Sequence, residues 1–254
     1  MKFNVMVLAL FIFVAAATSA QAVQTQITVR VKSKDAKFVG TSMGGALITI
    51  RNVQTGELLA KGYTSGGTGN TARIMKTPVS RGMPLSDESA AAFGATIDID
   101  EPTLIEVSAY GPLAGLQSAN RVSATQWVVP GKHITGGDGF LMELPGFVVK
   151  VEAPSSHSML AAKAVTIRAN VTMMCGCPIT PGGIWDANKI EVTALLYKNG
   201  KRAGVLTMQY AGMPNQFTGT WTIQEAGTYE AAVYAYDAAN GNTGIDRVSF
   251  MVGP

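Results

Sequence analysis

The chain has little of what most enzymes and nucleic-acid-binding proteins need. Of its 254 residues only two are cysteines and two are histidines, and charged residues make up 15%. The formal net charge is only +3, and no run of Lys and Arg of the kind that contacts phosphates is present. His133 and His157 alone leave few ways to build an acid–base pair. The composition therefore predicts a protein that neither binds nucleic acid nor catalyses a reaction.

Long hydrophobic runs are also missing, except at the N-terminus. Lys2 precedes an apolar run over residues 5–17, and Ala20-Gln21-Ala22 is a small-x-small site of the kind that signal peptidase cuts. The run is shorter than the roughly 20 residues that span a bilayer. We therefore expect residues 1–22 to be a cleaved signal peptide and the mature chain to be periplasmic or extracellular, with no membrane span.

The chain is rich in glycine and in alternating apolar and polar residues, which favours short strands joined by tight turns. We predict a mostly β protein with two tandem β-sandwich domains, residues 23–145 and 146–254, separated at Pro145-Gly146. A short helical insert is expected at residues 86–93, where Ser86 can cap a helix and Gly94 can end it. Strands are expected at residues 26–31, 46–53, 58–60, 95–99, 103–110, 126–129, 147–151, 164–173, 189–197, 205–209, 217–223, 229–236 and 247–252.

The first half carries motifs of a known family of small sandwiches. The segments are Ile27-Thr28-Val29, Gly45-Ala46-Leu47-Ile48-Thr49-Ile50, Thr64-Ser65-Gly66-Gly67 and residues 102–109. Together they resemble transthyretin-like, carboxypeptidase-regulatory-like domains, although residues 75–93 depart from the pattern. The resemblance implies an interaction or structural module.

The second half resembles bacterial immunoglobulin-like (Ig-like) and fibronectin-like domains, most clearly over residues 227–242. Tyr229 stands where such a sandwich has its tyrosine corner, and Ala231 occupies the place of the second immunoglobulin cysteine. The resemblance therefore implies a core held by packing alone, for which Trp221 is the expected large side chain. Asn199-Gly200 is a strong hairpin signal between two of the strands.

Both cysteines lie in one segment, Met173-Met174-Cys175-Gly176-Cys177-Pro178. In an extended strand Met173, Cys175 and Cys177 project from one face, and this row of soft sulfur donors suits Cu(I). The alternatives are a disulfide between the two cysteines, which would need Gly176 to bend the chain, or a purely structural buried face. The spacing matches neither a haem attachment motif nor a zinc site.

Other motifs have simpler explanations. Gly40-Thr41-Ser42-Met43-Gly44 matches the G-x-S-x-G nucleophile elbow, but a strand rather than a helix should follow it, which predicts a turn. The loop with Asp237, Asn240, Asn242 and Asp246 offers oxygen ligands for calcium, yet its composition is also that of a tight turn. We interpret it as a turn.

These observations predict a non-catalytic, exported binding or assembly module. Its expected partner is a protein or a periplasmic or cell-surface complex. No cofactor is expected under this hypothesis. The alternative hypothesis is a metal-handling protein that binds Cu(I) through Met173, Cys175 and Cys177.

Overall fold

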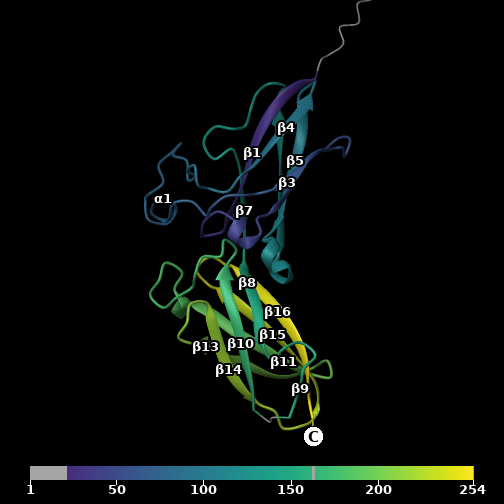
Figure 1. The fold of residues 1–254 in the computed structure, drawn as a ribbon, viewed down its shortest axis with the longest axis vertical. Helices are drawn as coiled ribbons and strands as arrows, with labels where there is room; N and C mark the ends of the chain where they lie inside the picture. Colours follow the sequence, from purple (N-terminus) through teal and green to yellow (C-terminus); the bar gives the residue numbers. More distant parts are fainter. Residues whose placement is uncertain (1–21, 162–163, 254) are drawn as a thin grey trace, which may run out of the picture.

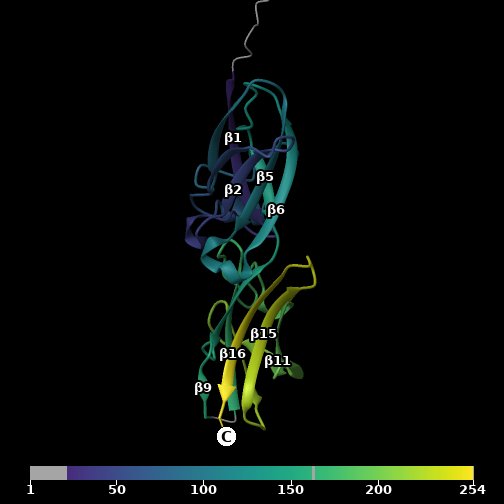
Figure 2. The same ribbon diagram turned by 90° about the vertical axis from the view of Figure 1, so that its right-hand side faces the viewer.

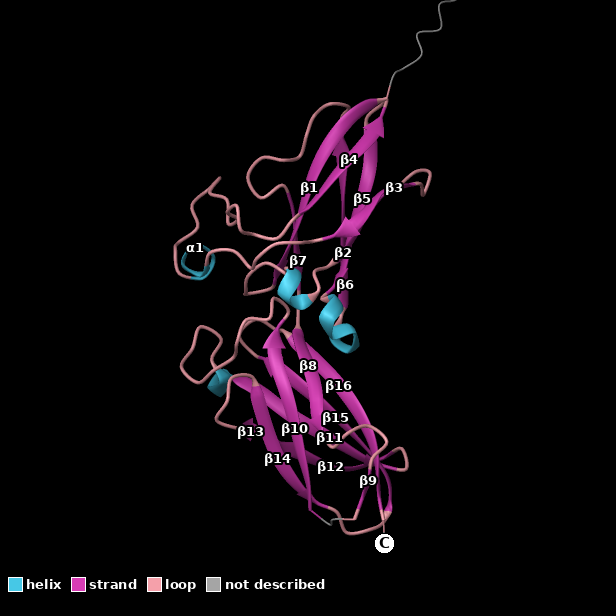
Figure 3. Cartoon of the chain, viewed as in Figure 1, coloured by secondary structure: helices cyan, strands magenta, loops and turns pink. Residues whose placement is uncertain are grey.

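The computed structural model describes residues 22–161 and 164–253, which form an elongated molecule of two β-sandwiches stacked end to end (Figure 1). The predicted signal peptide, residues 1–22, lies outside the described residues apart from Ala22. Strands dominate the molecule, as the sequence predicted (Figure 3). Within the described ranges, no helix is long and apolar enough to cross a membrane.

The first sandwich packs a three-stranded sheet, β4-β1-β7, against a four-stranded sheet, β3-β2-β5-β6. β1 runs antiparallel to β4 and parallel to β7. Its strands are β1 (Val23–Ser33), β2 (Leu47–Asn52), β3 (Leu58–Tyr63), β4 (Phe93–Ile99), β5 (Thr103–Gly111), β6 (Asn120–Val128) and β7 (Phe140–Leu144). The inward side chains alternate along each strand, as in β1, where Ile27, Val29 and Val31 are buried.

The second sandwich packs the sheet β13-β14-β10-β8 against the sheet β12-β11-β15-β16-β9. Its strands are β8 (Phe147–Ala153), β9 (Met159–Leu160), β10 (Ala164–Met173), β11 (Ile190–Lys198), β12 (Lys201–Thr207), β13 (Gln209–Tyr210), β14 (Gln216–Thr222), β15 (Gly227–Asp237) and β16 (Thr243–Val252). This strand order is that of an immunoglobulin sandwich, whose two sheets are ABED and GFCC′. The Ig-like architecture expected for this half is therefore present in the topology itself.

The expected corner and hairpin of the second sandwich are both formed. The Tyr229 hydroxyl donates a hydrogen bond to the Glu225 carbonyl at 2.6 Å, which is the geometry of a tyrosine corner. Asn199 and Gly200 both have positive φ, 48° and 78°, as a type I′ hairpin requires. The expectation that Trp221 fills the core was wrong, because Trp221 is only half-buried at one end of the sandwich. Phe147, Phe217 and Phe250 are the large, fully buried rings.

The helix predicted at residues 86–93 was also wrong. That segment is irregular, and the short helix α1 (Thr71–Met75) lies in the loop before it. The Asp87 side chain accepts hydrogen bonds from the Asn70 and Ser89 amides, so it holds two loop segments together instead of starting a helix. The alanines that suggested a helix instead form isolated β-bridges with the loop around Gly67.

The two sandwiches meet at a junction, here called the joint, where their cores share chain segments. The predicted boundary at Pro145-Gly146 falls between β7 and β8. Just after it, Phe147 and Val149 enter the second core while Val148 enters the first. The 3-10 helix η2 (Leu113–Ser118) also lies at the joint, against β8 and β16. The joint is thus packed from both sides.

Candidate functional site

The sulfur-containing residues form a tight turn at the joint, here called the sulfur turn (Met173–Cys177). β10 ends at Met173, and the chain reverses through a hydrogen bond from the Gly176 amide to the Met173 carbonyl at 2.8 Å. The Thr172 hydroxyl closes the turn by donating to the Cys177 carbonyl at 2.9 Å. Gly176 has φ +77°, which a glycine adopts without strain. The bend expected of Gly176 is therefore formed.

The structure brings the three predicted metal ligands into one place. Met173, Cys175 and Cys177 belong to the same buried cluster, the core of the second sandwich, and are 1%, 1% and 4% exposed. Cys175 and Cys177 are joined in a disulfide. In this state their sulfur atoms are bonded to each other, so Cu(I) binding requires reduction first and stays a prediction. Among the described residues, no three His, Cys, Asp or Glu side chains group as a metal site.

The sulfur turn contributes side chains to the cores of both sandwiches. Met174 points away from its neighbours and packs in the core of the first sandwich, 1% exposed. On the same side, Gly176 faces Met43 of the 3-10 helix η1 (Thr41–Met43), because a Cβ atom at Gly176 would lie 2.8 Å from Met43 Sδ. Met43 was not predicted, since no spacing in the sequence relates it to the cysteines. A fifth sulfur side chain therefore lies against the turn.

Two asparagine side chains, Asn240 and Asn242, form hydrogen bonds across the joint. The loop predicted as a turn, after β15, is a turn whose Gly241 amide bonds the Asp237 carbonyl. The fully buried Asn242 amide donates to the Lys34 carbonyl at 3.1 Å and accepts from the Gly146 amide at 2.9 Å. Asn240 donates to the carboxylates of Asp35 and Asp237. The polar residues considered as calcium ligands instead form hydrogen bonds within the chain. Two of them, Asn240 and Asn242, bond residues of the first sandwich.

Outward apolar side chains gather on the five-stranded sheet of the second sandwich. We call this surface the long-sheet face; it comprises Leu195, Tyr197, Val205, Tyr234, Tyr236, Ile245 and Met251. Val205 is 58% exposed and Ile245 is 40% exposed. On this face Arg247 bonds Glu230 at 2.6 Å, and the Tyr234 hydroxyl donates to Glu191 at 2.5 Å. Arg202, opposite Tyr197, is exposed. The face therefore mixes apolar side chains with charged ones.

The four-stranded sheet of the first sandwich lies on the same side of the molecule as this sheet (Figure 2), and it too carries exposed apolar side chains. Tyr63 and Trp127 are 57% and 56% exposed there. Tyr110 lies on the same face, with the Arg121 guanidinium 5.4 Å from its ring centroid, a cation–π contact. Leu116 of η2, 59% exposed, lies in the segment between β5 and β6 at the joint.

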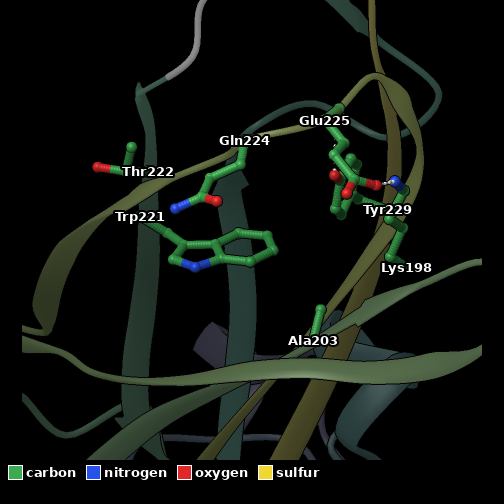
Figure 4. A pocket seen from close by; sticks show the side chains of 7 residues that line it. All are labelled: Lys198, Ala203, Trp221, Thr222, Gln224, Glu225 and Tyr229. Atoms are coloured by element: carbon green, nitrogen blue, oxygen red, sulfur yellow. Dashed lines mark hydrogen bonds and ion pairs between the residues drawn. The ribbon is translucent and has the colours of Figure 1, made fainter.

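A polar hollow of about 290 Å³ lies at the end of the second sandwich away from the joint (Figure 4). Trp221 and Gln224 line one side of it, and the ion pair of Lys198 with Glu225 lines the other. The hydrogen bond and charge of Glu225 raise the pKa of Lys198, and Lys198 lowers the pKa of Glu225. The hollow is wide open to solvent.

The nucleophile-elbow motif is a turn, as expected. Ser42 lies in η1, and β2 rather than a helix follows. His133 accepts a hydrogen bond from the Gln26 amide at 3.0 Å in the first sandwich, and His157 bonds Ser156 beside β9 of the second. The structure does not bring either histidine to Ser42.

Comparison with known proteins gives no family for the chain. No family model matches the chain, and no curated protein matches it. Among solved structures, fibronectin(III)-like modules of Clostridium thermocellum CbhA are 14% identical, with 90% of this chain and 93% of theirs covered and a TM-score of 0.29. Dpr2 Ig1-Ig2, solved in complex with DIP-Theta Ig1-Ig3, is 10% identical over 90% of this chain and 99% of that chain, with a TM-score of 0.28.

An engineered protein is 19% identical over 50% of this chain, with a TM-score of 0.33, and this chain spans about a quarter of its length, 24%. The strand order itself, not these similarities, gives the second sandwich its Ig-like architecture. The transthyretin-like resemblance of the first half stays a prediction.

Proposed function

We propose that the chain is an exported, non-catalytic binding or assembly module that docks a protein partner on the long-sheet face. One observation carries the proposal: this face exposes several large apolar side chains on a single rigid sheet. Contiguous exposed apolar surface on a soluble protein typically marks an interaction site. The N-terminal signal supports export, and the rigid Ig-like scaffold supports a binding role without specifying one.

The chemistry of the face favours a protein over a charged polymer. Tyrosines and aliphatic side chains are typical of the centre of protein–protein interfaces, whereas unpaired charges are depleted there. Glu230 and Arg247 on this face are paired with each other, so docking over them leaves neither of these two charges without a partner. Polar groups at the edges can form the rim.

Site-specific photo-crosslinking in the exporting cell tests the proposal. A photoreactive amino acid at Ile245 should give one discrete adduct with a protein, and Val205→Ser should reduce its yield. The control is Val79, an apolar residue on a loop of the first sandwich that is more exposed than Ile245, at 60% against 40%. Adducts of the same kind from Val79, or none from Ile245, would contradict the proposal. An adduct with a second copy would identify the partner as this chain.

A second candidate function is Cu(I) binding at the sulfur turn. The grouping of Met173, Cys175 and Cys177 in one buried cluster favours it, because thiolates and thioethers are the ligands that Cu(I) prefers. The reduced mature chain should take up about one Cu(I) in competition with a chelator, and Cys175→Ser or Cys177→Ser should abolish uptake. Equal uptake by wild type and both cysteine variants would remove this function.

A further inference from the structure

We propose that two copies of the chain pair edge to edge through β6 of the first sandwich. β6 is the last strand of the sheet β3-β2-β5-β6, and among the described residues only β5 is hydrogen-bonded to it. The free edge of such a strand presents a row of backbone N–H and C=O groups with which another strand can pair. This surface belongs to the first sandwich, whereas the long-sheet face belongs to the second.

β6 is long and regular for an edge strand. It has nine residues and pairs with β5 along its whole length without a register shift. The other edge strands that the structure describes are two to seven residues long. Natural proteins usually protect an edge by shortening it, bending it or charging it, and Arg121 is the one charged residue of β6. β6 therefore keeps the geometry that accepts another strand.

The free edge of β6 is accessible from outside. Seven of its nine residues are exposed, the exceptions being Val122 and Val128, and the exposed ones include Ala124 at the middle of the strand. Trp127 is 56% exposed. β7 of the opposite sheet lies near β6 but does not pair with it. A strand from a second molecule can therefore reach the edge without displacing a strand of this one.

The sequence of β6 is complementary to itself when two copies run antiparallel about Ala124. In this register Ala124 faces its own counterpart, Ser123 faces Thr125 of the second copy, and Arg121 faces Trp127 of the second copy. Hydroxyl pairs across a ladder are favourable, and a guanidinium is attracted to the face of an indole ring. Two-fold symmetry forms each of these contacts twice, and no two like charges meet. The favoured occupant of the edge is therefore β6 of a second copy.

The shape of the molecule also permits this pairing. Arg121 and Trp127 both lie on the outer face of the sheet, because they alternate with Val128, which is buried. β6 runs roughly along the long axis of the molecule (Figure 2). A two-fold axis through its middle therefore places the second sandwiches of the two copies at opposite ends. The two four-stranded sheets then form one continuous sheet across the dimer.

Sedimentation equilibrium of the full mature chain tests the proposal, and we expect a dimer in the wild type. Trp127→Arg places two arginines opposite each other twice, which should raise the dissociation constant about tenfold. Adding Arg121→Glu turns both contacts into ion pairs and should restore the dimer. Positions 121 and 127 lie roughly 20 Å apart along one strand, so this rescue has to act between copies. The matched control is Tyr63→Arg on β3, the other edge of the sheet, because Tyr63 is 57% exposed against 56% for Trp127.

Disulfide crosslinking gives a second, independent measurement of the register. Opposite Cα atoms in an antiparallel pair are about 4.5–5.5 Å apart, a distance that a disulfide spans, so Ala124→Cys should form linked dimers on oxidation. Gln126→Cys should not, because it faces Val122 of the second copy rather than its own counterpart.

Three results would each overturn the proposal. They are a monomeric wild type, a dimer that Trp127→Arg leaves intact, and a loss in Trp127→Arg that Arg121→Glu does not reverse. Circular dichroism checks that each variant is folded. If Trp127→Arg does not fold, the crosslinking pair decides: equal yields from Ala124→Cys and Gln126→Cys, or no linked dimer from Ala124→Cys, would contradict the pairing about Ala124.

Discussion

Tyr229 shows how a single hydroxyl fixes a corner of the second sandwich. Its ring is 3% exposed and packs against Trp221 and Phe250, and its hydroxyl donates to the Glu225 carbonyl. Tyr229→Phe keeps the packing and removes that bond, so we expect the free energy of unfolding to fall by about 1 kcal/mol. Urea denaturation measures the change.

The matched control for this prediction is Tyr210→Phe in the same sandwich. The Tyr210 ring packs edge-to-face on Phe217, and no hydrogen bond of its hydroxyl is seen in the part of the chain that the structure describes. This variant should unfold at the wild-type urea concentration. A loss as large as that of Tyr229→Phe would show that the corner bond contributes nothing specific.

The interactions of some residues can be predicted from the sequence, and those of others cannot. The role of Tyr229 could be predicted because its hydrogen bond is local and joins residues four positions apart in the chain. Asn242 and Met43 could not be placed, because their partners, Lys34 and Gly176, lie in the other sandwich. Long-range contacts leave no periodic signal in one sequence, so the residues that hold the joint came only from the structure. Adjacency in the sequence identified the sulfur residues as one segment, but it did not decide between an extended row of sulfurs and a disulfide-bonded turn.

At the scale of elements, alternation located most strands, because a half-buried strand must place every second side chain in the core. β10 follows this rule, with Val165, Ile167 and Ala169 buried on one face. The failure at residues 86–93 has a specific cause: Asp87 and the alanines meet the requirements of a helix start, but tertiary bonds to Asn70 and Gly67 prevail over this local preference.

The segment at Leu85 and Ser86, in the loop that carries α1, is bonded by the carboxylate of Asp138, which makes this contact depend on pH. Asp138 accepts hydrogen bonds from the Leu85 amide at 3.0 Å and the Ser86 amide at 2.7 Å. Burial raises the pKa of Asp138, but the bonds from Ser86 and Leu85, with the charge of Arg30, lower it further than burial raises it. Because the folded-state pKa lies below the ordinary value, the bonds are fully present above the ordinary pKa. They are lost as pH falls through the folded-state pKa.

We therefore expect cleavage of the native protein at the exposed Arg81 to increase below about pH 4. An acid-tolerant protease and hydrogen exchange of the Leu85 and Ser86 amides measure it. Asp138→Asn should speed exchange of the Leu85 and Ser86 amides already at neutral pH, whereas Asp98→Asn, on an exposed position of β4, should change nothing. Unchanged exchange in Asp138→Asn would mean that other contacts hold the loop.

At the scale of the whole molecule, the two sandwiches are built as one body. Val148 and Met174 enter the first core from segments of the second sandwich, while Ala36 and Met75 of the first sandwich pack against the second core. The amide of Asn242 binds backbone on both sides of the joint. The two cores therefore share side chains across the boundary at Pro145-Gly146.

The packing at the joint predicts that both sandwiches unfold in a single transition. Met174→Ala leaves a cavity in the first core while its backbone belongs to the second, and we expect it to lower the free energy of unfolding by about 2–4 kcal/mol.

Fluorescence of variants that keep only Trp127 reports on the first sandwich, and variants that keep only Trp221 report on the second. The two probes should shift together to the same lower urea midpoint. Met251→Ala, at an exposed position of the long-sheet face, should leave both midpoints in place. If the Trp127 and Trp221 midpoints separate in the wild type, the cores are independent, and the joint is only a contact between two domains.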